Sequence, residues 1–152
     1  MVGLDVFASG GNEIVSAAKA LKKKKLLGFL ADQDGYIHGL PVPFLGQPSS
    51  AVVGPATFAK KFGSPVVPIF TSRKPEGGHI VHILPPLHYN NSGDDDVDMY
   101  TLTEECVRVT EDFIREHPDE WIWFQHRWMT KMSEIVDYYK KLEIRERAHE
   151  KQ

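Results

Sequence analysis

Cysteine is almost absent from this chain, and so are long apolar runs and a surplus of charge. Only Cys106 occurs among 152 residues, which excludes an internal disulfide framework and fits a reducing compartment. No apolar stretch approaches the roughly 18–20 residues that span a bilayer, and Met1–Asp5 lacks the basic and apolar regions of a signal peptide. A net charge of -3 gives no general case for nucleic acid binding. We therefore expect a soluble or peripheral protein with one core.

Motifs that would assign a chemistry directly are also missing. The sequence has no Gly-x-Ser-x-Gly elbow, no Walker loop and no dinucleotide fingerprint. His79 and His82 are three apart on an expected strand, which points them to opposite faces, and no other pair completes a zinc set. Three alternate aspartates in residues 94–98 resemble the start of a calcium loop, but its glycine and distal glutamate are not in place. We expect no metal and no cofactor, and a solvated acidic loop at residues 88–100.

Two apolar runs organise what is present. Leu26–Leu30 and Val66–Thr71 have the length and composition of buried strands, and polar residues follow each of them. Because open α/β sheets bind ligands just beyond the ends of their strands, Asp32, Asp34 and Arg73 mark the expected working edge of the molecule.

The segment between these runs divides into a loop and a helix. Residues 35–54 contain four glycines and three prolines, which predicts a long irregular loop of the kind that is usually functional or mobile. Pro55 suits the first position of a helix that ends at Phe62, and Gly63 suits its stop. Ala56, Ala59 and Phe62 of this helix are expected to face the sheet.

Further elements follow from periodicity and capping signals. They are a helix beginning near Asn12, a hairpin strand at His79–Leu84, a helix at Thr101–His117 and a charged surface helix at Ser133–Gln152. Thr101 and Glu104 form a capping box for the third of these elements. Cys106 falls on the apolar face of the same helix and is interpreted as a core residue, not as a nucleophile.

Two polar features each have both a functional and a structural interpretation. Lys22–Lys25 form either a solvated helix end or a contact with an anionic membrane surface, where each lysine contributes roughly 1 kcal/mol. Asp32 and Asp34 are either members of a site, which orient donors, bind a sugar or act as a base, or parts of a turn rich in Asp and Gly.

Four blocks of the sequence resemble one family, in order and with the right gaps. The blocks are Leu27–Asp34, Val42–Gly46, Pro65–Phe70 with Arg73, and Phe113–Pro118 with Trp121, Trp123, His126 and Arg127. Together they resemble the bacterial lipid A biosynthesis acyltransferases, the late enzymes that add secondary fatty acyl chains, from about Val2 to Thr130. The resemblance implies part of a lysophospholipid-acyltransferase-like α/β fold, with a mixed central sheet flanked by helices. Residues 1–130 would be the C-terminal portion of the acyltransferase domain, and residues 131–152 a charged C-terminal helix.

The same resemblance implies a function in lipopolysaccharide biosynthesis. A fatty acyl group would move from acyl carrier protein to a hydroxyl of a lipid A precursor at the cytoplasmic face of the bacterial inner membrane, with peripheral contact to anionic lipid. Arg73 would meet a phosphate, because arginine suits bidentate phosphate binding. His126 and Arg127 would either do likewise or anchor the aromatic cluster around them. The residues expected to shape the donor or acceptor site are Asp32, Gln33, Asp34 and Gly35.

One departure from the family pattern concerns catalysis. The family's base is a histidine followed five positions later by Asp or Glu, and none of the seven histidines here has such a partner. The usual N-terminal membrane anchor is absent too. We therefore expect the catalytic residues upstream of Met1, as in a gene fragment, a late start or a split protein. The chain would then be inactive alone. The alternative is a non-catalytic lipid- or partner-binding module derived from the family.

Overall fold

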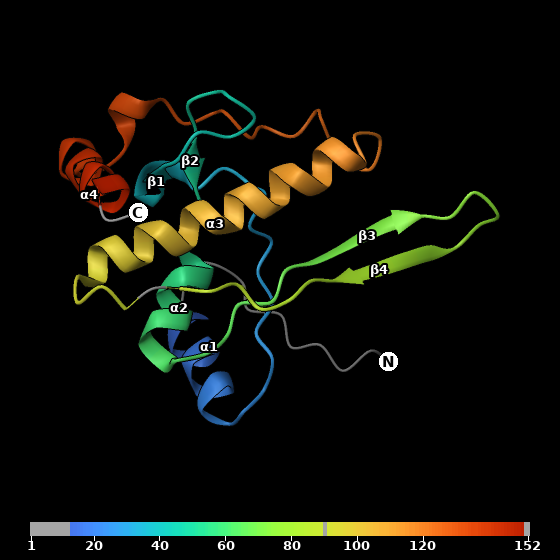
Figure 1. The fold of residues 1–152 in the computed structure, drawn as a ribbon, viewed down its shortest axis with the longest axis horizontal. Helices are drawn as coiled ribbons and strands as arrows, with labels where there is room; N and C mark the ends of the chain where they lie inside the picture. The colour runs from blue at the N-terminus through green and yellow to red at the C-terminus, as the bar shows by residue number, and fades with distance from the viewer. Residues whose placement is uncertain (1–12, 90, 151–152) are drawn as a thin grey trace.

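A computed structural model describes residues 13–89 and 91–150, and a long helix, α3 (Asp95–Glu116), crosses its centre (Figure 1). One side of α3 carries β1 (Leu40–Pro41), β2 (Ser50–Ala51) and α4 (Tyr138–Glu150), and the other carries α1 (Glu13–Lys22) and α2 (Gly54–Phe62). A hairpin of β3 (Ile69–Arg73) and β4 (His79–Ile83) projects from this body. The mixed α/β class is confirmed, but the strands of the described residues form two separate two-stranded sheets and not one central sheet.

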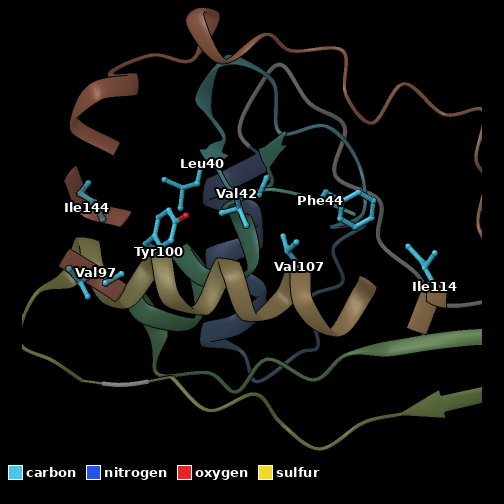
Figure 2. Close-up of a cluster of buried hydrophobic side chains, with 10 residues drawn as sticks. Leu40, Val42, Phe44, Val97, Tyr100, Val107, Ile114 and Ile144 are labelled. Atoms are coloured by element: carbon cyan, nitrogen blue, oxygen red, sulfur yellow. The ribbon is translucent and has the colours of Figure 1, made fainter. Parts of the chain in front are cut away.

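The segment 35–54 has the largely irregular backbone that was expected, with the two-residue strands β1 and β2 inside it, but its side chains build the core. Leu40, Val42 and Phe44 alternate along an extended chain, so their side chains point the same way, and Figure 2 shows them facing α3. They pack against Tyr100 and Val107 of that helix. The prolines and glycines of this segment lie at its turns, and the apolar residues between them fill the interior. The expectation of a functional or mobile loop overlooked this alternation.

The start of α3 was predicted wrongly, and the acidic loop expected at residues 88–100 gives way to helix at Asp95. Asp94 is the N-cap, and its Oδ1 accepts a hydrogen bond from the backbone N–H of Val97 at 3.2 Å. Acidic residues in the first turn complement the positive end of the helix dipole. Asp98 is buried and binds Lys60 Nζ at 2.7 Å, so the aspartates begin a helix and are not a solvated loop. Thr101 lies inside this helix and does not cap it.

The short helix α2 was predicted almost to the residue. It ends where Gly63 adopts a left-handed φ of 62°, a conformation that glycine takes at little cost. Ala56 and Ala59 are buried, but they pack against Leu102 of α3 and not against a sheet.

The β3–β4 hairpin confirms the predicted pairing. Its strands are antiparallel, with Ile69 opposite Ile83 and Arg73 opposite His79. The strand β3 begins later than expected, because Pro68 has no N–H to donate to a ladder. Its outward residues are exposed, so β3 is not the buried strand that the apolar composition suggested.

The predicted strand Leu26–Leu30 is wrong. These residues have no regular secondary structure, Leu26 is fully exposed, and Leu30 is 76% exposed. A strand needs a neighbour for its backbone hydrogen bonds, and no strand among the described residues pairs with this run. Composition alone therefore could not establish it as a strand.

The two ends of the described chain also differ from expectation. The helix α1 begins at Glu13, so the proposed cap Asn12 lies outside the described residues. The C-terminal helix α4 begins at Tyr138 and not at the expected Ser133, and it is more than a surface helix, because Ile144 and Ala148 are buried in the main core. None of the helices within residues 13–89 and 91–150 is long and apolar enough to cross a membrane. The proposed division at residue 130 stays a prediction.

Candidate functional site

An apolar cavity of about 520 Å³ lies beside α2 and α3, with residues 27–32 and 64–71 forming other parts of its wall. Most of its lining is apolar, with Phe58, Val109 and Phe113 among the contributing side chains. The size falls within the roughly 300–1,000 Å³ typical of small-molecule pockets. Residues 27–31 thus contribute to the cavity wall in place of the strand that was predicted for them.

One end of this cavity is polar. Asp32 lies there with three residues that follow α3, namely His117, Glu120 and Trp121. Asp32 Oδ2 accepts hydrogen bonds from the Trp121 indole at 3.2 Å and from the Gln125 side-chain amide at 3.3 Å. Both bonds are long, and the carboxylate is only half-buried. Asp32 is therefore positioned by the protein and still accessible from the cavity.

Asp34, two residues further on, points into the protein and is only 6% exposed. Its Oδ1 accepts hydrogen bonds from the hydroxyl of Thr130 at 2.6 Å and from the N–H of Tyr36 at 2.7 Å. Its Oδ2 accepts one from the N–H of Thr130 at 2.9 Å. Burial by itself would raise the pKa of the Asp34 carboxyl, but these bonds and the charge of Arg127 outweigh it, so the pKa is lowered. Asp34 therefore fixes the segment that ends at Thr130.

Arg127 is also internal, with 1% of its surface exposed. Its Nη1 donates to the carbonyl oxygen of Ser50 at 2.8 Å, and its guanidinium lies 4.5 Å from the centre of the Phe44 ring. Its Nε and Nη2 are buried without a hydrogen-bond partner among the described residues. Burial lowers the pKa of Arg127, and the charges of Asp34 and Asp32 act in the opposite direction. This geometry favours the anchoring interpretation over contact with an external phosphate.

Arg73, the third member of the expected edge, lies at the end of β3. Its backbone N–H donates to Glu120 Oε1 at 2.8 Å and its Nε to Glu120 Oε2 at 3.1 Å. Its Nη2 also donates to the carbonyl oxygen of Asp119 at 3.0 Å. Glu120 lines the polar end of the cavity, so Arg73 reaches that end through its partner. The Arg73 side chain remains largely exposed.

The other predicted site residues divide between the surface and the backbone framework. Gln33 and His126 are exposed. Gly35 packs against β2, where an added Cβ would lie 2.5 Å from the carbonyl oxygen of Ala51. The contact explains why a residue without a side chain occupies position 35. The structure thus brings Asp32 and the partner of Arg73 to the cavity and places Asp34, Gly35 and Arg127 behind it.

A histidine cluster beside the cavity was not foreseen. Ser72 Oγ lies 2.8 Å from His82 Nε2, and the rings of His82 and His117 each contact Phe113. The signal was available, because counting back from the turn at residues 77–78 puts Ser72 and His82 on the same face of the hairpin. Ser72 is buried and does not line the cavity, so the pair ties the hairpin to α3.

The chemistry available at this end is hydrogen bonding and charge, because no group of three or more His, Cys, Asp or Glu within the described ranges could hold a metal. Cys106 lines the cavity, and burial raises the pKa of its thiol to about 12, with a smaller contribution from Glu105. Since the thiolate is the nucleophilic form, the raised pKa disfavours Cys106 as a nucleophile at neutral pH.

Comparison with known proteins decides the family. Residues 2–130 match the family described as bacterial lipid A biosynthesis acyltransferase. The chain belongs to this family. The predicted resemblance, which ran from about Val2 to Thr130, is confirmed.

Relatives of this family member include two curated proteins. Both are phosphatidylinositol mannoside acyltransferases of Mycobacterium tuberculosis, one from strain H37Rv and one from strain CDC 1551, and each is 24% identical over 136 residues. The matched region covers 88% of this chain and 41% of each relative, so the chain spans about two fifths of their length. The family match and these relatives therefore agree on membership of an acyltransferase family.

Proposed function

We propose that this chain is part of an acyltransferase that moves a fatty acyl group from acyl carrier protein to a hydroxyl of a lipid A precursor. The observation that carries the proposal is the family match across residues 2–130. Under it, the chain acts in lipopolysaccharide biosynthesis at the cytoplasmic face of the bacterial inner membrane. We further propose that the complete enzyme has a lysophospholipid-acyltransferase-like fold.

The cavity supports an acyl substrate. Its apolar walls suit a hydrocarbon chain, because each methylene group moved from water into such surroundings gains about 0.8 kcal/mol. The polar end then meets the reacting end of the acyl group or the acceptor hydroxyl, with Asp32 already oriented by Trp121 and Gln125. Fixed polar groups of this kind hold a substrate in position for reaction.

In this proposal Arg73 binds a phosphate beside the polar end of the cavity. Its side chain is 61% exposed, and the guanidinium binds Asp119 and Glu120 beside the cavity. A phosphate of the lipid or of the carrier arm would compete with these carboxylates for the same donors. Gln33 and His126 of the predicted set are exposed as well and would contact the headgroup or the carrier.

The general base lies outside residues 1–152 in this proposal. His38, His79, His82, His88, His117 and His126 are each followed five positions later by a residue other than Asp or Glu, and His149 has no such position. A histidine that removes the hydroxyl proton is held in orientation by a carboxylate. In our proposal, a segment with the His-x4-Asp/Glu pattern supplies that pair.

Two alternatives have a specific observation behind them. The acceptor is a phosphatidylinositol mannoside in one, because the curated relatives carry that activity in their name. In the other, the chain is a non-catalytic lipid- or partner-binding module, because the histidine pattern is missing from it.

The acceptor is tested in a protein that joins these residues to a segment with the His-x4-Asp/Glu pattern. Labelled acyl-acyl carrier protein is supplied with either a lipid A precursor or a phosphatidylinositol mannoside, and the lipid products are separated. We expect label in the lipid A product. Label only in the mannoside selects the first alternative, and label in neither selects the binding module.

A further inference from the structure

The turn that follows α1 combines positive charge with exposed apolar surface. Residues 14–31 contain five lysines and no acidic residue, although the whole chain has a net charge of -3. Lys22, Lys23 and Lys24 are exposed, and Leu26 directly after them is fully exposed. We call Lys22–Leu26 the basic turn. The basic turn is positively charged, whereas the whole chain has a net negative charge, so the positive charge is local to this turn.

The backbone holds the basic turn in a defined shape. The N–H of Lys24 donates to the carbonyl oxygen of Leu21 at 2.8 Å, and that of Lys25 donates to Ala20 at 3.0 Å. Lys24 has a φ of 58°, which is uncommon for a residue with a side chain and reverses the chain at the helix end. The lysines therefore lie together at one tip, on the side of the molecule away from α4 (Figure 1).

The basic turn also lies at the rim of the apolar cavity. Leu21 before it and Leu27 after it both line that cavity. Leu30, further along the same wall, is 76% exposed. A lipid that reaches this tip is therefore next to the cavity.

We propose that the basic turn docks on an anionic lipid bilayer, with Lys22–Lys24 at the headgroups and Leu26 in the acyl region. Charge complementarity favours this partner, because anionic lipid attracts clustered lysines and the exposed leucine gains from leaving water. The inference rests on the proposed function in one respect, that an enzyme acting on a lipid must meet the bilayer. The docked turn presents the rim of the cavity to the lipid.

The expected size of the effect follows from the charges. Each lysine near an anionic surface contributes about fivefold to the partition coefficient, so three contribute about 100-fold. Burying one leucine side chain adds about tenfold or more. Salt weakens the lysine part, because the Debye length falls from about 10 Å at 0.1 M to about 3 Å at 1 M.

The test is flotation of the 152-residue chain with vesicles of phosphatidylcholine alone or mixed with phosphatidylglycerol. One variant changes Lys22, Lys23 and Lys24 to Gln, and a charge-matched control changes the exposed Lys74, Lys131 and Lys140 to Gln. We expect the first to lose about 100-fold in binding to the anionic vesicles and the control less than threefold. Leu26→Ser should lose about tenfold, and the equally polar change Ile83→Ser on the hairpin should lose little. Circular dichroism confirms that each variant is folded.

Several outcomes overturn the proposal. Equal losses in both triple variants mean that net charge, and not the basic turn, governs binding. Equal binding to both vesicle types excludes an electrostatic contact. Unchanged vesicle binding with weakened binding to acyl carrier protein makes the turn a protein-docking surface. The vesicle measurements contain no acyl donor or acceptor, so a failure there leaves the acyl-transfer proposal standing. A failure of acyl transfer likewise leaves the vesicle result standing.

Discussion

Replacing Asp34 with Asn tests whether this carboxylate stabilises the folded protein. The side chain keeps its shape but loses its charge, and one oxygen becomes an NH₂ group. Asp34 accepts three hydrogen bonds, two of them from Thr130 and one from the N–H of Tyr36. In the variant, the new donor faces at least one N–H donor at short range, so that bond is lost.

The cost is estimated from these contacts. A hydrogen bond to a charged group is worth about 1.5–3 kcal/mol, and Arg127 also loses a buried opposite charge. We expect Asp34→Asn to lower the free energy of unfolding by about 2–4 kcal/mol, a large part of the roughly 5–15 kcal/mol of an ordinary domain. Urea unfolding followed by tryptophan fluorescence measures it, because Trp121 and Trp128 pack against the core.

The pH dependence gives an independent check. The pKa of Asp34 in the folded protein is lowered from its ordinary 3.8, so its contribution is complete above that value and is lost as the pH falls through the folded pKa. The Asn variant has no such group. The difference in free energy of unfolding between the two proteins should therefore shrink as the pH is lowered from about 5 toward about 3.

The matched control is Asp32→Asn, two residues away. Asp32 accepts only two long bonds and is half-buried, so we expect a cost under about 1 kcal/mol. If both variants lose the same stability, or if the gap for Asp34 does not change between these pH values, the structural role that we assign to Asp34 is refuted.

Three further predictions follow from single contacts. In a catalytically active longer protein, Asp32→Asn should lower acyl transfer about 10–100-fold with little loss of stability, since it removes a charged hydrogen-bond partner at the cavity. Unchanged turnover would show that Asp32 only forms part of a turn. Asp98→Asn should cost about 2–3 kcal/mol and Asp95→Asn under about 1 kcal/mol, because Lys60 binds both aspartates but Asp98 is buried and Asp95 is exposed. If urea unfolding shows similar losses of stability for the two variants, burial does not explain the difference that we expect between Asp98 and Asp95. Cys106 should react with a disulfide reagent at pH 8 far more slowly in the native protein than in urea, because its pKa is raised to about 12; equal rates would show an accessible thiolate.

Local signals predicted local structure well. Pro55 and Gly63 bracketed α2 because helix ends depend on backbone properties of single residues. The β3–β4 pairing followed from two apolar runs and a glycine turn. Leu26–Leu30 failed because a strand is defined by its partner, which the run itself does not specify. Asp94 was overlooked as a cap because three successive aspartates also suit a loop.

The site was only partly predictable for the same reason. The sequence indicated that Asp32 and Arg73 follow apolar runs, and both lie at or beside the polar end of the cavity. Nothing in the spacing showed that Asp34 would face inward, because its orientation depends on Thr130, which is far away in the sequence. The burial of Arg127 likewise depends on Ser50 and Phe44.

The most direct test of the central claim is acyl transfer by residues 1–152 with and without the missing base. Labelled acyl-acyl carrier protein and a lipid A precursor are incubated with the isolated chain, with the chain joined to a segment that carries His-x4-Asp/Glu, and with the same protein after His→Ala. Positioned acid–base groups contribute roughly 10²–10⁴-fold, so we predict no detectable transfer by the first and third proteins and clear transfer by the second. Robust transfer by the isolated chain contradicts the account, because one of its own histidines would then serve as the base.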